Sequence, residues 1–280
     1  MKNIHVDTIT ENVAAMCQSA SIDLGDDMIQ AFQSSLQKEK SDIGQDVITQ
    51  LLDNAEIAQK ERMPMCQDTG MAVFFIEMGY DCKITCGDLY DAINKGVSQG
   101  YGDGYLRQSI VRDPLDRKNT GDNTPAITYV EMVEGDHLKI RFTAKGGGAE
   151  NMSRLQMLKP SDGLEGIEDF VVESVRLAGP NACPPVIVGV GIGGSFEKSA
   201  YIAKKSLLRS VGERHVEERI ARLEEKWTEK CNQLGIGPQG MGGTTTALDV
   251  KIEVQPCHIA AMPVAVNIQC HANRHKEVIL

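Results

Sequence analysis

The sequence contains no long hydrophobic run. Its longest apolar stretch lies around Val186–Ile192 and is interrupted by glycines, so it falls far short of the roughly 20 residues that a membrane-spanning helix requires. Residues 1–20 include Asp7 and Glu11 and lack the continuous apolar core of a secretory signal peptide. We therefore expect a cytoplasmic protein with no membrane partner.

The sequence also contains fewer positively charged than negatively charged residues. The chain has 29 lysines and arginines against 39 aspartates and glutamates, which gives a formal net charge of −10. A surface that binds nucleic acid needs a basic patch facing the phosphates, so we expect no nucleic-acid partner. This charge balance still allows a few arginines to be focused on a small anionic substrate.

Internal repeats, low-complexity tracts and an obvious linker are absent too, so we expect one domain over residues 1–280. The 280 residues and the hydrophobic content of 41% are enough for a substantial core. Some segments repeat apolar residues at helical spacing, and others are short β-like runs. The helical segments are residues 7–37, 43–61, 88–98, 163–177, 195–208 and 215–234, and the β-like runs are residues 71–78, 126–133, 137–144, 186–190 and 248–254.

The runs at residues 126–133 and 137–144 are separated by a short segment that contains Gly135, which predicts an antiparallel hairpin. Helices dominate both ends of the chain, and the β-like runs are short. The pattern therefore favours an α+β fold, with mixed helices and short, partly antiparallel sheets in a single large domain. A doubly wound parallel sheet is the alternative.

The eight cysteines do not form a compact motif. They are residues 17, 66, 82, 86, 183, 231, 257 and 270. In a chain that is neither small nor visibly secreted, metal binding or catalysis is the expected use of those cysteines that are not simply buried. Cys82 and Cys86 are spaced C-x3-C without a second pair nearby, so we expect both to be packed or incidental. Cys231 lies on an apolar helical stripe and is expected in the core.

Cys66 has an unusual polar setting. It begins the sequence Cys66-Gln67-Asp68-Thr69, with Pro64 shortly before it and Gly70 directly after. Proline biases the residue before it away from the helical region, and glycine permits turns that other residues resist. The four polar side chains are therefore predicted on a bent loop after a helix. A turn with a buried structural cysteine is the alternative.

Cys183 and Cys270 share that setting. Cys183 lies between Gly179-Pro180 and Pro184-Pro185, and Cys270 follows a predicted strand and precedes His271. Each is expected on a loop at the end of an element. Spacing alone does not decide whether the three cysteines meet. Because Cys270 lies close to Leu280, we expect something outside this chain to cover the site.

Three glycine-containing segments also offer anion-binding groups. Arg107 follows the glycine-rich loop at residues 100–105 and suits the capture of a carboxylate, with an exposed arginine as the alternative. The glycines at residues 146–148 allow backbone N–H groups to converge on an anion, or form a flexible surface loop. Gly189–Gly194 matches G-x-G-x-x-G but lacks the second strand that ends in an acid. Close packing of a strand, a loop and a helix, or loop amides that face a neighbouring anionic site, explains these glycines better.

Three blocks, Met63–Gly70, Gly179–Pro185 with Gly189–Gly194, and Val266–His275, resemble the class I (iron–sulfur) fumarate hydratases. The match is to the alpha subunit of their two-chain form and to the closely similar L(+)-tartrate dehydratase alpha subunit, and it covers nearly the whole chain. The resemblance implies that Cys66, Cys183 and Cys270 hold a [4Fe–4S] cluster. Its fourth iron has no protein ligand and acts as a Lewis acid.

The resemblance also implies an activity, which is the reversible hydration of fumarate to L-malate. Gln67, Asp68 and Arg107 would be the catalytic and substrate-binding side chains, with Arg107 on a substrate carboxylate and Gly148 donating its backbone N–H. A beta subunit would complete the active site in a hetero-oligomer built on a dimer. The alternatives are dehydration of L(+)-tartrate to oxaloacetate, and a non-catalytic metal or iron–sulfur binding protein. The histidines at 258, 271 and 275 are acid/base candidates because histidine titrates near neutral pH, and His271 beside Cys270 is the best placed. A structural role or one that orients the site is the favoured alternative.

Overall fold

The computed structural model describes every residue from 1 to 280. The chain divides into two compact units, each with its own sheet and core. The first unit consists of Met1–Leu24, Ala55–Gly147 and Arg274–Leu280, and the second consists of Gly25–Asn54 and Gly148–Asn273. Each unit is therefore assembled from segments that are far apart in the sequence.

The first unit is built on a four-stranded sheet in the order β10-β5-β2-β4. Its strands are β2 (Met71–Gly79), β4 (Ile127–Val133), β5 (Leu138–Lys145) and β10 (His275–Ile279). Strand β2 pairs antiparallel with β5 and parallel with β4, and β10 pairs antiparallel with β5. Strands β1 (Lys2–His5) and β3 (Cys82–Thr85) form a separate parallel pair.

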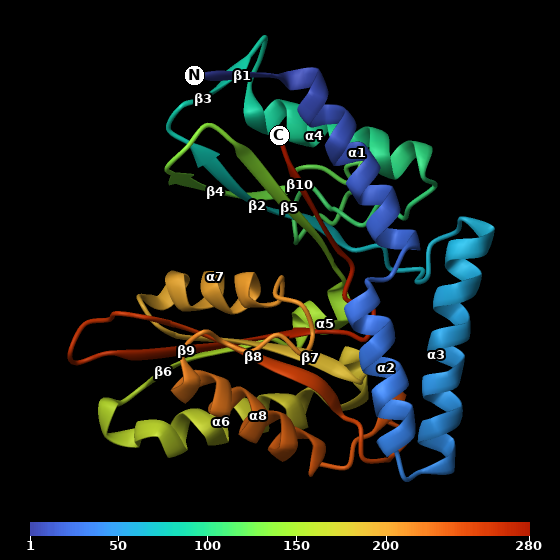
Figure 1. Cartoon of the computed structure of the whole chain (residues 1–280), viewed down its shortest axis with the longest axis vertical. Helices are drawn as coiled ribbons and strands as arrows, with labels where there is room; N and C mark the ends of the chain where they lie inside the picture. The colour runs from blue at the N-terminus through green and yellow to red at the C-terminus, as the bar shows by residue number, and fades with distance from the viewer. The chain divides into compact units, whose positions relative to one another are not determined.

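Helices α1 (Val6–Ile22) and α4 (Leu89–Asp103) cover one face of this sheet (Figure 1). Phe74 of β2 and Phe142 of β5 belong to the buried cluster that the helices complete, and their ring centroids lie 5.2 Å apart. A Cβ at Gly96 of α4 would lie 2.7 Å from the backbone oxygen of Thr10, and one at Gly100 would lie 2.8 Å from that of Ala14. The two helices therefore pack at a distance that only glycine allows.

The predicted hairpin between residues 126–133 and 137–144 is wrong in its pairing. Strands β4 and β5 lie on opposite sides of β2 rather than next to each other. The turn between them passes the end of β2, where a Cβ at Gly79 would lie 2.2 Å from the carbonyl oxygen of Gly135. The strongly apolar β2 pairs with both strands and separates them.

The second unit contains a four-stranded sheet in the order β6-β9-β7-β8. Its strands are β6 (Arg154–Leu158), β7 (Val186–Gly193), β8 (Ala247–Gln255) and β9 (Met262–Gln269). Strand β7 pairs parallel with β8 and antiparallel with β9, and β6 pairs antiparallel with β9. Helix α7 (Phe196–Ser206) lies on one face, and α6 (Gly163–Ala178) and α8 (Glu218–Asn232) lie on the other (Figure 1).

The glycines of the G-x-G-x-x-G sequence let α7 pack directly on β7. A Cβ at Gly189 would lie 2.1 Å from the backbone oxygen of Ala203, and one at Gly191 would lie 2.1 Å from that of Ser199. No side chain fits at either position. Close packing of a strand and a helix, one of the two explanations that the sequence left open, therefore accounts for Gly189 and Gly191.

Most predicted elements are present, with three differences. Helix α4 continues to Asp103, so the first part of the predicted glycine-rich loop at residues 100–105 is helical. Strands β1, β3, β6 and β10 were not predicted. The segment at residues 7–37 forms two helices, α1 and α2 (Asp26–Lys38), and α3 (Asp42–Glu61) follows. The short elements are α5 (Gly147–Asn151), η1 (Pro160–Asp162), η2 (Gly179–Ala182) and η3 (Pro238–Gly240). Mixed helices with partly antiparallel sheets confirm the α+β class. No helix combines the length and the apolar character needed to cross a membrane.

Candidate functional site

The segment that carries Cys66 is an irregular loop between α3 and β2, as predicted. The backbone N–H of Met65 donates to the carbonyl oxygen of Ser21 at 3.0 Å, which fixes the start of the loop to the end of α1. Cys66 is a free, partly buried thiol whose Sγ lies 3.6 Å from Oε1 of the exposed Gln67. The loop therefore presents a thiol and an amide side by side.

The carboxylate of Asp68 is held by backbone amides from both sides. Its Oδ1 accepts a hydrogen bond from the N–H of Gly70 at 3.1 Å, and its Oδ2 accepts one from the N–H of Gly147 at 2.8 Å. The sequence left open whether the amides of residues 146–148 meet an anion or belong to a flexible surface loop. One of them, that of Gly147, meets the carboxylate of Asp68, so this side chain has a fixed orientation.

Buried groups support the backbone directly after Asp68. The hydroxyl of Tyr101 donates to the carbonyl oxygens of Thr69 and Gly70, at 3.0 and 3.1 Å. Burial raises the pKa of Tyr101, so the phenol remains a protonated donor. Nδ2 of Asn123 also donates to the carbonyl oxygen of Gly70, at 3.2 Å. The hydrogen bonds from Tyr101 and Asn123 therefore hold the turn that follows Asp68 in place.

Arg107 is joined to the same loop through its backbone. The hydroxyl of Thr69 donates to the carbonyl oxygen of Arg107 at 3.1 Å. The Arg107 side chain is exposed, and no hydrogen bond or ion pair engages its guanidinium. The first unit thus brings four predicted site residues, Cys66, Gln67, Asp68 and Arg107, into one connected group with an unpaired cation.

The second unit brings Cys183 and Cys270 together. The backbone N–H of His271 donates to the carbonyl oxygen of Cys183 at 3.3 Å, and Nδ1 of the same histidine lies 3.0 Å from that oxygen. Cys183 is exposed and Cys270 is partly buried. A Cβ at Gly148 would lie 3.2 Å from the carbonyl oxygen of Asn181, so the Gly148 backbone lies beside the Cys183 loop.

The sequence reasoning missed Gln239, which contacts both of these loops. Its backbone N–H and its Nε2 donate to the carbonyl oxygen of Pro184, at 2.7 and 2.9 Å. Nε2 also lies 3.0 Å from Nδ1 of His271. The only sequence signal was the long glycine-rich stretch at residues 235–243, which gives no indication of the side chain's partners.

The chemistry of the three predicted ligands fits an iron–sulfur cluster. Cys66, Cys183 and Cys270 form no disulfide bonds, each lies on a loop, and none is fully buried. Iron–sulfur clusters are held by cysteine thiolates, and such ligands need access to the bound group. Within either unit, no three cysteine, histidine or carboxylate side chains converge on a common point. Cys66 belongs to the first unit, whereas the other two cysteines belong to the second.

Other cysteines have the properties of core residues. Cys17 and Cys231 are completely buried. Burial raises the pKa of Cys17, and it raises that of Cys231 to about 12. Cys82 is buried as well, and burial raises its pKa. These thiols are poor metal ligands because the thiolate form is disfavoured. The core position predicted for Cys231 is confirmed, and Cys86 is exposed.

The other two candidate histidines lie in different settings. His258 is exposed in the turn between β8 and β9, where its Nδ1 accepts a hydrogen bond from the N–H of Ala260 at 3.1 Å. His275 is the first residue of β10 and pairs with Thr143 of β5. His271, by contrast, contacts the loop of a candidate cysteine ligand.

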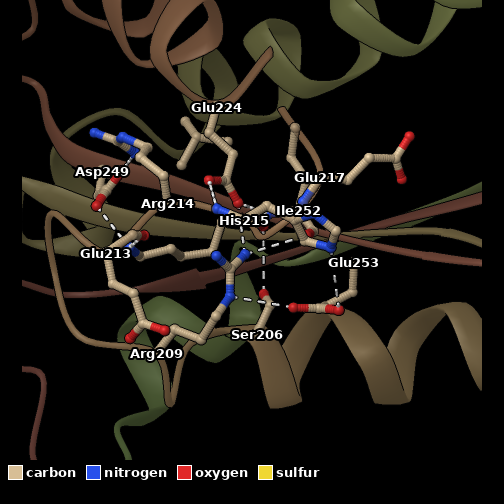
Figure 2. Close-up of polar contacts among 12 residues, drawn as sticks. Ser206, Arg209, Glu213, Arg214, His215, Glu217, Glu224, Asp249, Ile252 and Glu253 are labelled. Carbon is tan, nitrogen blue, oxygen red and sulfur yellow. Dashed lines mark hydrogen bonds and ion pairs between the residues drawn. The ribbon is translucent and has the colours of Figure 1, made fainter. Parts of the chain in front are cut away.

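A second polar cluster, in the second unit, is structural (Figure 2). The buried carboxylate of Glu224 accepts hydrogen bonds from the backbone N–H of Ile252 at 2.8 Å and of His215 at 2.9 Å. Asp249, also buried, accepts from the N–H of Gly212 at 2.7 Å and pairs with Lys251 at 2.9 Å. These contacts fix the segment before α8 to β8 and engage both carboxylates.

Comparison with known proteins places this chain in a family. The sequence model of the fumarate hydratase (Fumerase) family matches residues 10–279. The chain therefore belongs to the fumarate hydratase family, and it is an enzyme of the hydro-lyase class, which adds or removes water.

Curated relatives cover almost the full chain. A protein of Methanocaldococcus jannaschii named "Putative L(+)-tartrate dehydratase subunit alpha" is 41% identical over 273 residues, which are 95% of each chain. The L(+)-tartrate dehydratase subunit alpha of Escherichia coli (strain K12) is 34% identical over 279 residues, which are 98% of this chain and 91% of the relative. The resemblance expected from the three sequence blocks is thus confirmed.

Proposed function

We propose that this chain is the alpha subunit of an iron–sulfur hydro-lyase that catalyses the reversible hydration of fumarate to L-malate. The observation that carries the proposal is the contact between His271 and Cys183. This contact brings two of the three candidate ligands together in a chain of the fumarate hydratase family. The connected group of Cys66, Asp68 and Arg107 supplies the third candidate ligand and a cation for the substrate.

Cys66, Cys183 and Cys270 would hold a [4Fe–4S] cluster. When bound, such a cluster has an iron without a protein ligand, which supplies Lewis-acid polarisation of an oxygen atom. The chain contributes the three thiolates on loops that are fixed by backbone hydrogen bonds. This arrangement leaves the ligands accessible, whereas the buried Cys17 and Cys231 are excluded from the ligand set.

The chain's own side chains would bind and orient the dicarboxylate. The exposed guanidinium of Arg107 has no partner in this chain, and it can bind a substrate carboxylate through two parallel hydrogen bonds. Gln67 is exposed beside Cys66 and offers both a donor and an acceptor. Gly148 offers a backbone N–H. Donors placed in advance stabilise the charge that builds on the carboxylate when the adjacent carbon loses its proton.

Asp68 is assigned an orienting role next to the reacting groups. Two backbone N–H groups donate to its carboxylate and hold it in one orientation. A carboxylate held in this way accepts hydrogen bonds from a substrate hydroxyl or from a water molecule. We assign no general base to this chain, and we place that group on a partner subunit.

A beta subunit would complete the active site. The relatives in Methanocaldococcus jannaschii and Escherichia coli carry the words "subunit alpha" in their names. We infer by analogy that both units of this chain form one catalytic domain of the alpha-subunit type over residues 1–280. This domain would assemble with a beta chain into a hetero-oligomer built on a dimer.

Dehydration of L(+)-tartrate to oxaloacetate is the second candidate, because the names of the relatives favour it. Both reactions remove water from a four-carbon 2-hydroxy dicarboxylate, so the same carboxylate-binding groups serve either one. L-Malate and L(+)-tartrate differ by one hydroxyl group. A site built to hydrogen-bond that hydroxyl would reject malate strongly, because its polar groups would be left unpaired.

The test is a side-by-side assay of the reconstituted complex with fumarate, L-malate and L(+)-tartrate under anaerobic conditions. We expect kcat/KM for malate or fumarate to exceed that for tartrate by about tenfold or more, which corresponds to about 1.4 kcal/mol. A preference for tartrate of the same size would select the second candidate. A complex that contains a full cluster and turns over none of the three would contradict the hydro-lyase proposal.

A further inference from the structure

Gln239 occupies a conformation that is unfavourable for its residue type. It has φ 51° and ψ 19°, in the left-handed region. Cys183 is also left-handed, with φ 52° and ψ 66°. Such conformations cost free energy for residues other than glycine and persist only where neighbouring groups hold them in place. The two residues meet at Pro184, whose carbonyl oxygen accepts two hydrogen bonds from Gln239.

The loop that carries Gln239 is itself firmly anchored. Glu39, only 3% exposed, accepts hydrogen bonds from the backbone N–H groups of Thr244 and Thr245, each at 2.8 Å. A Cβ at Gly243 would lie 2.8 Å from Oε1 of Glu39. On the other side, the N–H of Gly237 donates to Oγ1 of Thr246 at 3.2 Å. The carboxamide of Gln239 is thus presented from a fixed backbone.

The contacts of Gln239 connect the two cysteine loops of the second unit. Its donors hold the carbonyl oxygen directly after Cys183, and its carboxamide meets the ring of His271, which is the residue directly after Cys270. His271 in turn contacts the carbonyl oxygen of Cys183. Removal of the Gln239 side chain would therefore loosen both loops at once, without touching either sulfur atom.

We propose that Gln239 is a positioning residue that sets the relative placement of Cys183 and Cys270 as cluster ligands. The inference rests on the proposed function, because it takes these two thiolates as ligands. Residues that orient metal ligands contribute strongly to metal retention, and their loss costs about 10- to 100-fold in affinity. Gln239 acts through Pro184 and His271, and the proposal gives it no contact with the substrate.

The informative variant is Gln239→Gly. Glycine adopts the left-handed conformation without strain, so the backbone hydrogen bond to Pro184 is retained while the carboxamide is removed. The complex is reconstituted anaerobically, and two properties of its cluster are measured, the rate of iron release to a chelator and the electron paramagnetic resonance spectrum after reduction. The melting temperature of the cluster-free chain is measured alongside. Gln233→Ala, at an exposed position after α8, is the matched control.

We expect Gln239→Gly to release iron about tenfold faster than the wild type and to show a changed resonance spectrum. Its cluster-free melting temperature should be at or above the wild-type value, and Gln233→Ala should match the wild type throughout. An unchanged release rate and spectrum would overturn the role of Gln239. Faster release together with a clearly lower cluster-free melting temperature would also overturn it. A wild-type complex that takes up no iron and sulfide would overturn the proposed function itself.

Discussion

Arg274 donates a hydrogen bond from Nη1 to the backbone carbonyl oxygen of Asp68 at 2.7 Å, between residues 206 positions apart in the sequence. Arg274 is 2% exposed and has no carboxylate partner. Asp68 is thus held through both its side chain and its backbone, by Gly70 and Gly147 at the carboxylate and by Arg274 at the carbonyl. The arginine just after the Cys270 loop therefore supports the candidate substrate-binding loop.

Arg274→Lys should lower kcat with a smaller effect on KM. A lysine retains the charge but lacks the planar donors of the guanidinium, so the Asp68 loop would shift. Displacement of site groups by about 1 Å can cost on the order of 100-fold in rate. Steady-state kinetics of the reconstituted complex measure the effect. Arg176→Lys, at an exposed residue paired with Glu173, is the control, and equal kinetics for both variants would contradict this role.

Gly70 and Gly121 make a matched pair for testing how tightly the Asp68 loop is packed. Both have left-handed backbones, with φ 78° and 87°. A Cβ at Gly70 would lie 2.8 Å from backbone atoms of Lys145, whereas a Cβ at Gly121 would meet nothing within 4 Å. We expect Gly121→Ala to cost about 1 kcal/mol from backbone strain alone.

Gly70→Ala should cost clearly more than Gly121→Ala in the free energy of unfolding, because the steric clash adds to the strain. It should also reduce activity, since the clash displaces the loop that carries Cys66 and Asp68. Denaturant unfolding and an activity assay on both variants provide the comparison. Equal destabilisation by the two substitutions would show that the close approach of Gly70 to Lys145 is not maintained in solution.

The carboxylate of Glu39 should make stability depend on pH. Burial alone would raise the pKa of Glu39, but hydrogen bonds from backbone N–H groups of Thr244, Ser41 and Thr245 lower it from 4.5 to about 2. A lowered folded-state pKa stabilises the protein above the unfolded-state value, and this contribution is lost as the pH falls toward 2. The shift corresponds to about 3 kcal/mol at neutral pH.

Glu39→Gln should therefore lower the free energy of unfolding by about 3 kcal/mol at pH 7. The difference from the wild type should shrink progressively as the pH falls from 5 toward 2. Unfolding curves across that range test both statements, with Glu56→Gln, at an exposed position in α3, as the control. A deficit that is independent of pH would mean that the charge of Glu39 is not the cause.

A substitution at Asp249 tests whether the polar cluster around Glu224 and Asp249 is structural. Asp249→Asn removes the negative charge next to Lys251, which is 0% exposed, and next to Arg214. Loss of one partner from a buried ion pair typically costs about 3–5 kcal/mol. Glu218→Gln breaks the exposed pair with Arg222 and should cost less than about 1 kcal/mol. Similar losses for both variants, measured by urea unfolding, would contradict the structural assignment.

The sequence predicts local features of this protein well because they depend on neighbouring residues. Pro64 and Gly70 were sufficient to place Cys66 on a loop after a helix. The order of strands in the first unit could not be predicted in this way, because it depends on pairing between segments far apart in the sequence, such as that of β2 with both β4 and β5. Gln239 was missed because nothing in its own sequence context indicates contact with the Cys183 loop.

The most direct test of the central claim is the iron and acid-labile sulfide content after anaerobic reconstitution. We predict about four of each per chain in the wild type, and loss or destabilisation of the cluster in Cys66→Ser, Cys183→Ser and Cys270→Ser. Cys82→Ser and Cys257→Ser should retain the wild-type content. Iron without sulfide, zinc in its place, or indifference to the first three substitutions would contradict the assignment of these cysteines to an iron–sulfur cluster.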